Sequence, residues 1–483
     1  MITEKDLAKL LFTTCEGLSS PTVQGKSLSP GAGAGRILRT REDAAKLSAN
    51  ETGIYCCTSL SSEDLSLMGN QQVTGYTVET TDDTRHEVVI LRASGKPLVG
   101  GVNASSLNAL EFITIDGCNG VVCEGIKPLR QPDVENSSTQ QVLSDLIGNS
   151  RITVRANADT PAQTRKARIL GAKGLGPVRT EYMFYTEGRL PLMQRFILTS
   201  DDSCLTELAE LQQQDFAGIL KEMNDYPVGI RLFDPPFNEF TPKKEEDKRK
   251  LAATLGISYQ TLCDKINQFD EDNPMLGTRG VRLGILRPEV YKMQLVAAFS
   301  AAADLINRGY NPKPDITVPF IAFPNEIEQT RKLIDEIALD IQRKEGVTIP
   351  YTVTAMIELP IACLNAGRIA EYVDGFSFGT NDLAQTTYGI SRTDMGKTLE
   401  IYKQRGIISQ SPFTTLDQGL LELLQIAIER GRKTNNKLTI GICGEQGAER
   451  TSAEKCIRLG MDYISCSPYR VPFVNLYAQR NKK

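Results

Sequence analysis

The chain has 483 residues, of which 40% are hydrophobic and 24% charged, and its formal net charge is −4 at pH 7. This length predicts about two to four domains with sizeable cores. The slightly acidic balance excludes binding to nucleic acid or to anionic membranes through bulk positive charge, and no apolar run is long enough for a membrane span. Eleven cysteines without zinc-type spacing and an N-terminus unlike a signal peptide favour reduced thiols and a cytoplasmic location.

The N-terminal third predicts a small domain that is rich in β-strands. Residues 1–25 are expected to form a helical extension, and "SLSPGAGAGRILRT" at 27–40 is a Pro/Gly-rich turn that enters a strand. Short β-rich runs such as "TGIYCCTSL" and "FITIDGCNGVVCEG" follow it. We therefore expect a small β-rich α/β domain at 26–126 and a polar linker at 127–145.

Residues 146–483 alternate apolar strand-like runs with amphipathic helical runs. This alternation is typical of a parallel α/β fold and favours a closed (β/α)8 TIM-type barrel. Nine runs are candidate strands, one more than the barrel needs. They are "RITVRAN", "GLGPVRTEYMF", "PVGIRLFDPP", "RGVRLGIL", "DITVPFIAF", "PYTVTAMIELP", "GFSFGTNDL", "KLTIGICGEQG" and "DYISCSP", of which "RGVRLGIL" has the weakest pattern.

Polar functional groups follow the apolar runs at their C-terminal sides. They are Arg155, Arg179 with Glu181, Arg231 with Asp234, Glu358, Asn381 with Asp382, Glu445 and Cys466. In a parallel barrel these ends converge on the face that carries the active site. Arginines bind phosphate or carboxylate through forked hydrogen bonds, and carboxylates beside an anionic substrate suit Mg²⁺. The pattern predicts a metal-assisted enzyme that acts on a small anionic phosphate ester.

Six motifs in this order resemble the barrel domain of the pyruvate, phosphate dikinase family of phosphoenolpyruvate (PEP)-utilising enzymes. They are "GAKGLGPVRTEYMF", "IRLFDPPFNEF", "NPMLGTRGVRLGI", "MIELP", "FSFGTNDLAQ" and "GICGEQG…DYISCSPYRVP". The resemblance implies a barrel that binds PEP or pyruvate through Mg²⁺, with Glu358 and Asp382 as the metal-binding carboxylates. It implies substrate binding by Arg179, Arg231, Arg279 and Arg392, with Thr380 and Asn381 beside them.

Cys466 falls on the family's general acid, which protonates the enolate of pyruvate at C3. A thiol with an ordinary pKa of roughly 8.5 is protonated at neutral pH and can donate a proton. The alternative is a buried structural thiol, the usual role of a lone cysteine. For Glu358 and Asp382 the alternative is a pair of solvated or salt-bridged carboxylates.

His86, in "TDDTRHEVVILR" at 81–92, is the only histidine of the chain. The segment resembles the phosphohistidine motif of the family's swivel domain, which implies that His86 carries the phosphoryl group. Thr81 and Asp82 stand where the family has two glycines, and Glu87 replaces an alanine. Added acidic groups are unfavourable neighbours for a phosphoryl group, so the alternative is a relict surface histidine.

The resemblance implies phosphoryl transfer between PEP and His86, the pyruvate half-reaction of a dikinase. The family's ATP-grasp nucleotide domain does not fit into the 25 residues before the swivel domain, so we expect a separate nucleotide-binding partner. Family members commonly dimerise through the barrel, and a homodimer is expected. The alternatives are a PEP-binding regulatory pseudoenzyme and, more distantly, aldol-type chemistry on a Mg²⁺–enolate.

Overall fold

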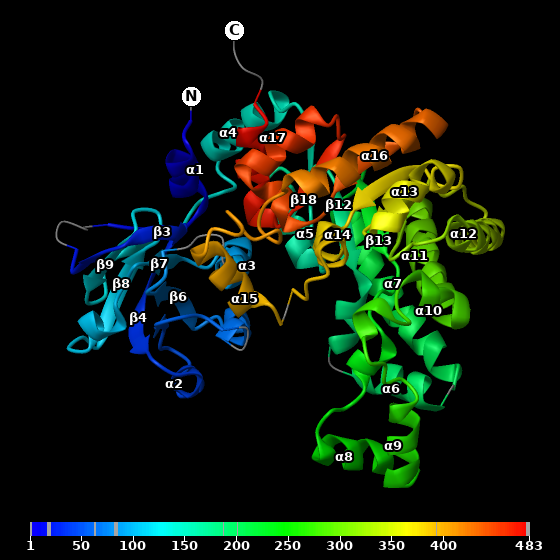
Figure 1. The fold of residues 1–483 in the computed structure, drawn as a ribbon, viewed down its shortest axis with the longest axis horizontal. Helices are drawn as coiled ribbons and strands as arrows, with labels where there is room; N and C mark the ends of the chain where they lie inside the picture. The colour runs from blue at the N-terminus through cyan, green and yellow to red at the C-terminus, as the bar shows by residue number, and fades with distance from the viewer. Residues whose placement is uncertain are drawn as a thin grey trace.

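The computed structural model describes residues 2–16, 21–61, 64–81, 86–186, 188–199, 201–392 and 394–479. Its two main parts are a mixed sheet near the N-terminus and a closed parallel barrel (Figure 1). Helix α1 (Glu4–Leu11) precedes the sheet and begins with a capping box between Thr3 and Asp6. A membrane-spanning helix is absent from the described residues, because none of their helices has the length and apolar character that a bilayer requires.

The N-terminal sheet has eight strands in the order β2-β9-β8-β4-β5-β6-β7-β3. Their bounds are β2 (Val23–Gln24), β3 (Lys26–Ser29), β4 (Ala32–Leu38), β5 (Gly53–Cys57), β6 (Val73–Val78), β7 (Leu98–Gly100), β8 (Phe112–Asp116) and β9 (Val121–Glu124). Helices α2 (Arg41–Ala45) and α3 (His86–Ser94) complete this β-rich α/β domain. A two-stranded ladder of β1 (Thr14–Cys15) and β10 (Leu129–Arg130) lies beside it.

The barrel consists of eight parallel strands that close in chain order. They are β11 (Thr153–Ala156), β12 (Leu175–Arg179), β13 (Pro227–Arg231), β14 (Lys313–Val318), β15 (Thr352–Ile357), β16 (Gly375–Phe378), β17 (Thr439–Ile442) and β18 (Tyr463–Cys466). Strands that are covered on both faces need continuous apolar runs, which is the pattern seen in the sequence. The (β/α)8 prediction is therefore confirmed, and eight of the nine candidate strands are barrel strands.

The helices from residue 137 onward surround the barrel or lie in the segments that connect its strands. They are α4 (Ser137–Gly148), α5 (Pro161–Ile169), α6 (Arg189–Thr199), α7 (Ser203–Glu222), α8 (Glu245–Leu255), α9 (Tyr259–Asn267), α10 (Val281–Leu286), α11 (Pro288–Asn307), α12 (Pro324–Glu345), α13 (Pro360–Ile369), α14 (Thr380–Tyr388), α15 (Gly396–Gln404), α16 (Gln418–Thr434), α17 (Arg450–Arg458) and α18 (Val471–Tyr477). The α8–α9 pair projects away from the barrel (Figure 1).

"RGVRLGIL", the weakest of the nine candidates, is the one that is not a barrel strand, and it forms the short helix α10. Gly280, just before α10, has φ +56°. This backbone conformation is unfavourable for residues with a side chain, and it turns the chain into the helix. Val281 and Leu283 are buried, so a six-residue segment matches the period of a strand as well as that of a helix.

The N-terminal domain packs against the C-terminal part of the barrel. Helix α3 contacts the 3₁₀ turn η7 (Pro468–Arg470), which follows β18. Gly95, just after α3, lies so close to Tyr469 that an added Cβ would come within 2.7 Å of the ring. The ring of Tyr469 also stacks on Phe12, with ring centroids 5.5 Å apart. Tyr469 thus joins the N-terminal helix, the N-terminal domain and the segment just beyond Cys466.

Candidate active site

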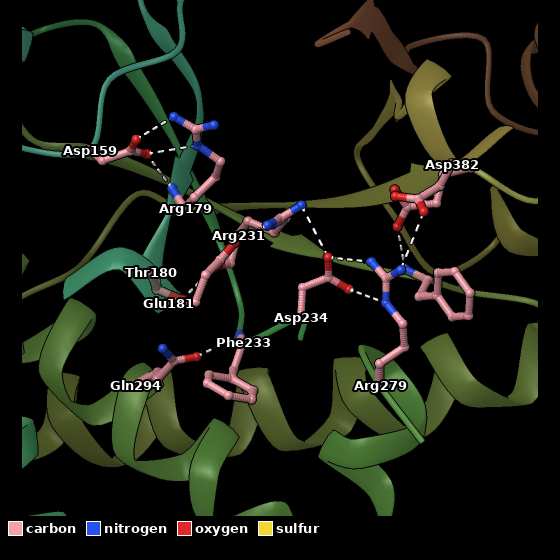
Figure 2. Close-up of polar contacts among 12 residues, drawn as sticks. Asp159, Arg179, Thr180, Glu181, Arg231, Phe233, Asp234, Arg279, Gln294 and Asp382 are labelled. Carbon is pink, nitrogen blue, oxygen red and sulfur yellow. Dashed lines mark hydrogen bonds and ion pairs between the residues drawn. The ribbon is translucent and has the colours of Figure 1, made fainter. Parts of the chain in front are cut away.

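The C-terminal ends of the barrel strands gather a row of buried or half-buried ion pairs (Figure 2). Arg179, the last residue of β12, donates to Asp159 from its backbone nitrogen at 2.8 Å, from Nε at 3.2 Å and from Nη2 at 2.5 Å. Its guanidinium also lies 4.6 Å from the centre of the Tyr182 ring. Three bonds to one carboxylate fix the direction of this arginine.

The next two arginines share one carboxylate. Arg231, at the end of β13, donates to Glu181 and lies 3.2 Å from Oδ2 of Asp234. Arg279 donates to the same Asp234 through Nη2 at 2.6 Å and Nε at 3.3 Å. Its Nη1 reaches Oδ1 of Asp382 at 3.2 Å. These contacts form a continuous chain of alternating charges across the face (Figure 2).

Glu358 follows β15 and is 1% exposed. Its Oε1 accepts a hydrogen bond of 2.7 Å from the backbone N–H of Phe320. Phe320 has φ +60°, which is rare for a bulky residue, and its ring lies 4.4 Å from the Arg279 guanidinium. Burial, together with repulsion from Asp382 and Asp234, raises the pKa of Glu358 well above its ordinary value.

Cys466 ends β18 and is fully buried. Its Sγ lies 4.0 Å from the backbone oxygen of Arg155, and its own carbonyl accepts a hydrogen bond from the Asn157 nitrogen at 2.7 Å. Burial and the nearby negative charge of Glu445 raise the thiol pKa well above its ordinary value. A thiol in this environment stays protonated, which is the state that a proton donor needs.

Several buried polar atoms around the face have no hydrogen-bond partner within the described ranges. They are Nε of Arg231, Oε2 of Glu181, Oδ1 of Asn238 and Oγ of Ser467. Buried polar atoms are normally paired, so a cluster of unpaired ones at the end of a barrel is typical of a site that receives a polar ligand.

Residues 134–482 match the family model of the PEP-binding domain of PEP-utilising enzymes. The chain belongs to this family. It is 39% identical over 495 residues to pyruvate, phosphate dikinase of Rhizobium meliloti, covering 98% of this chain and 55% of that relative. It is 37% identical to pyruvate, phosphate dikinase of Giardia intestinalis (97% of this chain, 55% of the relative) and 39% identical to pyruvate, phosphate dikinase 1, chloroplastic, of Oryza sativa (94% and 50%). The chain thus spans about half the length of these curated relatives.

The residues that the PEP-utilising family pattern singles out lie in different surroundings. Thr380 opens α14 fully buried and donates to Oε1 of Gln446 at 2.8 Å, so its hydroxyl is engaged within the protein. Asn381 and Asp382, in the same first turn, are half-buried. Arg392 follows α14 and is half-buried. Burial lowers the pKa of its guanidinium, and the negative charges of Asp382 and Glu445 partly oppose this effect.

The carboxylates Glu358 and Asp382 fit a divalent cation. Burial and, after it, repulsion from Asp382 raise the pKa of Glu358, so an added positive charge near both carboxylates would stabilise their ionised forms. No group of three or more His, Cys, Asp or Glu side chains in the described parts of the chain is arranged to hold a metal. Two carboxylates are enough for Mg²⁺, which keeps the rest of its shell for water and substrate phosphate.

His86 is the first residue of α3, and its side chain lies outside the described part of the structure.

Arg155 was expected on the face at the C-terminal ends of the strands, and the structure places its side chain elsewhere. It points into the barrel interior, where its Nη1 lies 3.5 Å from Oδ2 of Asp315 and its guanidinium 3.8 Å from the Tyr463 ring. Asp159, three residues beyond β11, holds Arg179 and was missed. The sequence could have indicated Asp159, because it follows a barrel strand just as the other carboxylates of the site do.

Proposed function

We propose that the chain catalyses Mg²⁺-dependent phosphoryl transfer between PEP and His86, the pyruvate half-reaction of a dikinase. One observation carries this proposal. Three arginines held by carboxylates lie on the same barrel face as the Glu358–Asp382 pair and a buried thiol whose pKa is raised by burial. Phosphate, carboxylate and enolate are the groups that such a set can bind and protonate.

The arginines would bind the anionic groups of PEP. Arg179, Arg231 and Arg279 each keep guanidinium geometry fixed through carboxylate partners, so their remaining N–H groups are preorganised for phosphate and carboxylate oxygens. Glu358 and Asp382 would hold Mg²⁺, which when bound neutralises charge on the phosphoryl and enolate oxygens. The family membership of the barrel supports this assignment.

The reaction balances with this chain's own residues. The bond between phosphorus and the enol oxygen of PEP breaks as a bond forms between phosphorus and a nitrogen of His86. The electron pair stays on the oxygen as an enolate, and C3 takes the proton of the Cys466 thiol to give pyruvate. In the reverse direction the thiolate removes a methyl proton from pyruvate.

A PEP-binding regulatory role without phosphoryl transfer is the second candidate. It is favoured by the acidic residues beside the only histidine, Asp82, Asp83 and Glu87. Their charge opposes a phosphoryl group on His86. This alternative keeps the arginine row and the Glu358–Asp382 pair as a PEP site and removes only the transfer.

We also propose the partners of the reaction. An ATP-grasp unit outside these 483 residues would supply the nucleotide chemistry, and residues 26–126 would act as the phosphohistidine domain that serves the barrel at 146–483. A second copy of the chain would pair through the barrel. This pairing is supported by three exposed apolar side chains, Leu286 on α10 (66% exposed), Phe323 just before α12 (60%) and Leu364 on α13 (45%). We place the enzyme in the cytoplasm.

The transfer is tested by incubating the purified chain with Mg²⁺ and phosphorus-labelled PEP. We expect label on the protein that is lost in acid and stable in base, as on an imidazole nitrogen. His86→Gln should stay unlabelled while it still binds PEP. An unlabelled wild type that binds PEP would favour the regulatory role.

A further inference from the structure

A cavity of about 530 Å³ lies between the N-terminal domain and the barrel. Its walls come from α1, β3 and α3 on one side and from the segments that follow β17 and β18 on the other. Glu4 and Arg450, which are exposed, belong to its lining. Glu445, a half-buried residue of the barrel face, lines the same cavity. Glu445 therefore lies between this cavity and the barrel face.

Glu445 also lies beside the buried thiol. It follows β17, which pairs with β18, the strand that ends in Cys466. Asn157 connects the two, since its Nδ2 donates to Oε1 of Glu445 at 3.3 Å and its backbone nitrogen donates to the Cys466 carbonyl at 2.7 Å. The backbone N–H of Ser467 also donates a hydrogen bond to the Glu445 carboxyl, which lowers the pKa of this group. The carboxyl is thus held against residues 465–467.

The proposed reaction requires a proton supply for Cys466. The thiol is fully buried, and its Sγ lies 4.0 Å from the backbone oxygen of Arg155, which has no proton to give. The charged groups that act on the thiol are Glu445 and Arg470. An arginine does not release its proton in a protein, so Glu445 is the group of this pair that can exchange one.

We propose that Glu445 relays protons between the Cys466 thiol and water in the cavity. This role rests on the proposed function. After the thiol has given its proton to C3, the O–H bond of the Glu445 carboxyl breaks and the S–H bond of Cys466 forms again. The carboxylate then takes a proton from water in the cavity, and the reverse reaction uses the same path in the opposite direction. Glu445 acts through Cys466 and does not touch the substrate.

The surroundings of Glu445 suit a group that gains and loses a proton. Burial raises its pKa, while the charges of Arg470 and Arg179 and the hydrogen bond from Asn157 lower it. Burial is the largest of these effects, so the pKa of the Glu445 carboxyl is raised above its ordinary value. The thiolate, whose pKa is raised further, is the stronger base and takes the proton from the carboxyl.

Two isotope exchanges measured in the same sample test the relay. The first is the exchange of carbon label between pyruvate and PEP, which can proceed while the thiol returns the same proton. The second is the entry of deuterium from solvent into the methyl group of pyruvate, which needs the thiol to exchange with water. For Glu445→Gln and Glu445→Ala we expect the ratio of deuterium entry to carbon exchange to fall by about 100-fold, a contribution typical of a positioned acid or base.

Formate added to Glu445→Ala should raise this ratio again, since a small acid can enter the space that the side chain leaves. Glu4→Gln, which alters another carboxyl of the same cavity, should keep the wild-type ratio. A wild-type ratio in Glu445→Gln would overturn the relay, and so would a parallel loss of both exchanges in both Glu445 variants, which would mark a structural role. A wild type without carbon exchange would overturn the proposed function itself, and the relay with it.

Discussion

Arg279 holds Asp234 by two hydrogen bonds, from Nη2 to Oδ2 at 2.6 Å and from Nε to Oδ1 at 3.3 Å, and both side chains are at most 5% exposed. The same carboxylate lies 3.2 Å from Nη1 of Arg231. One buried aspartate therefore sets the positions of two arginines from different elements, the end of β13 and the loop before α10.

Asp234→Asn should lower the free energy of unfolding by about 3 kcal/mol, because it leaves two buried guanidinium groups without their shared counter-charge. Denaturant unfolding measures this change. Asp304→Asn removes an exposed partner of Arg308 on α11 and should cost at most about 0.5 kcal/mol. Equal losses in the two variants would contradict the structural role of Asp234.

Asp382→Asn should weaken PEP binding in the presence of Mg²⁺ by at least about tenfold, a loss that even changes outside the direct metal ligands can cause. Calorimetric titration gives the affinities. Chelation of the metal should bring the wild type down to the level of the variant. Asp340→Asn, on the exposed side of α12, should bind PEP as the wild type does. Equal affinities of Asp382→Asn and wild type would exclude Asp382 as a metal ligand.

Cys466→Ala should bind PEP as the wild type does, while the rate at which deuterium enters the methyl group of pyruvate falls by about 100-fold or more. Proton nuclear magnetic resonance in deuterated solvent follows this reaction. Cys456→Ala removes another fully buried thiol, on α17, and serves as the control for lost volume. Wild-type exchange by Cys466→Ala would mean that the thiol is structural.

Alkaline pH should destabilise the protein through its buried thiols. Burial raises the pKa of Cys363, on α13, to about 12. Since the unfolded thiol titrates near an ordinary pKa of about 8.5, the folded state binds more protons between these values, and stability present below pH 8.5 is lost as the pH rises. The slope is about 1.4 kcal/mol per pH unit for one thiol. Unfolding free energies of wild type and Cys363→Ala at pH 8 and pH 10 should therefore converge, and an unchanged difference would contradict this explanation.

The sequence predicted the barrel because strands covered on both faces leave continuous apolar runs, and these recur eight times with helices between them. "RGVRLGIL" stayed an open ninth candidate because Val281 and Leu283 are buried in a segment too short to separate the period of a strand from that of a helix. The turn at Gly280 that starts α10 lies so close to Phe320, 40 residues further along the chain, that a Cβ on Gly280 would come within 2.5 Å of the Phe320 Cβ.

The sequence predicted those site residues that lie at the C-terminal ends of the barrel strands. Arg179, Arg231 and Glu358 lie where that rule puts them. Arg155 does not, because a partner inside the barrel, Asp315, draws its side chain inward, and such a pairing across the barrel leaves no local pattern in the sequence. The sharing of Asp234 by two arginines depends equally on tertiary structure.

The exchange of carbon label between pyruvate and PEP tests the central claim most directly. The purified chain receives both compounds and Mg²⁺ without any nucleotide, since a phosphohistidine intermediate makes the half-reaction reversible on its own. We expect label to pass between the two compounds with the wild type and not with His86→Gln, while both proteins bind PEP equally. Exchange that continues in His86→Gln, or a wild type that binds PEP and does not exchange label, would contradict phosphoryl transfer through His86.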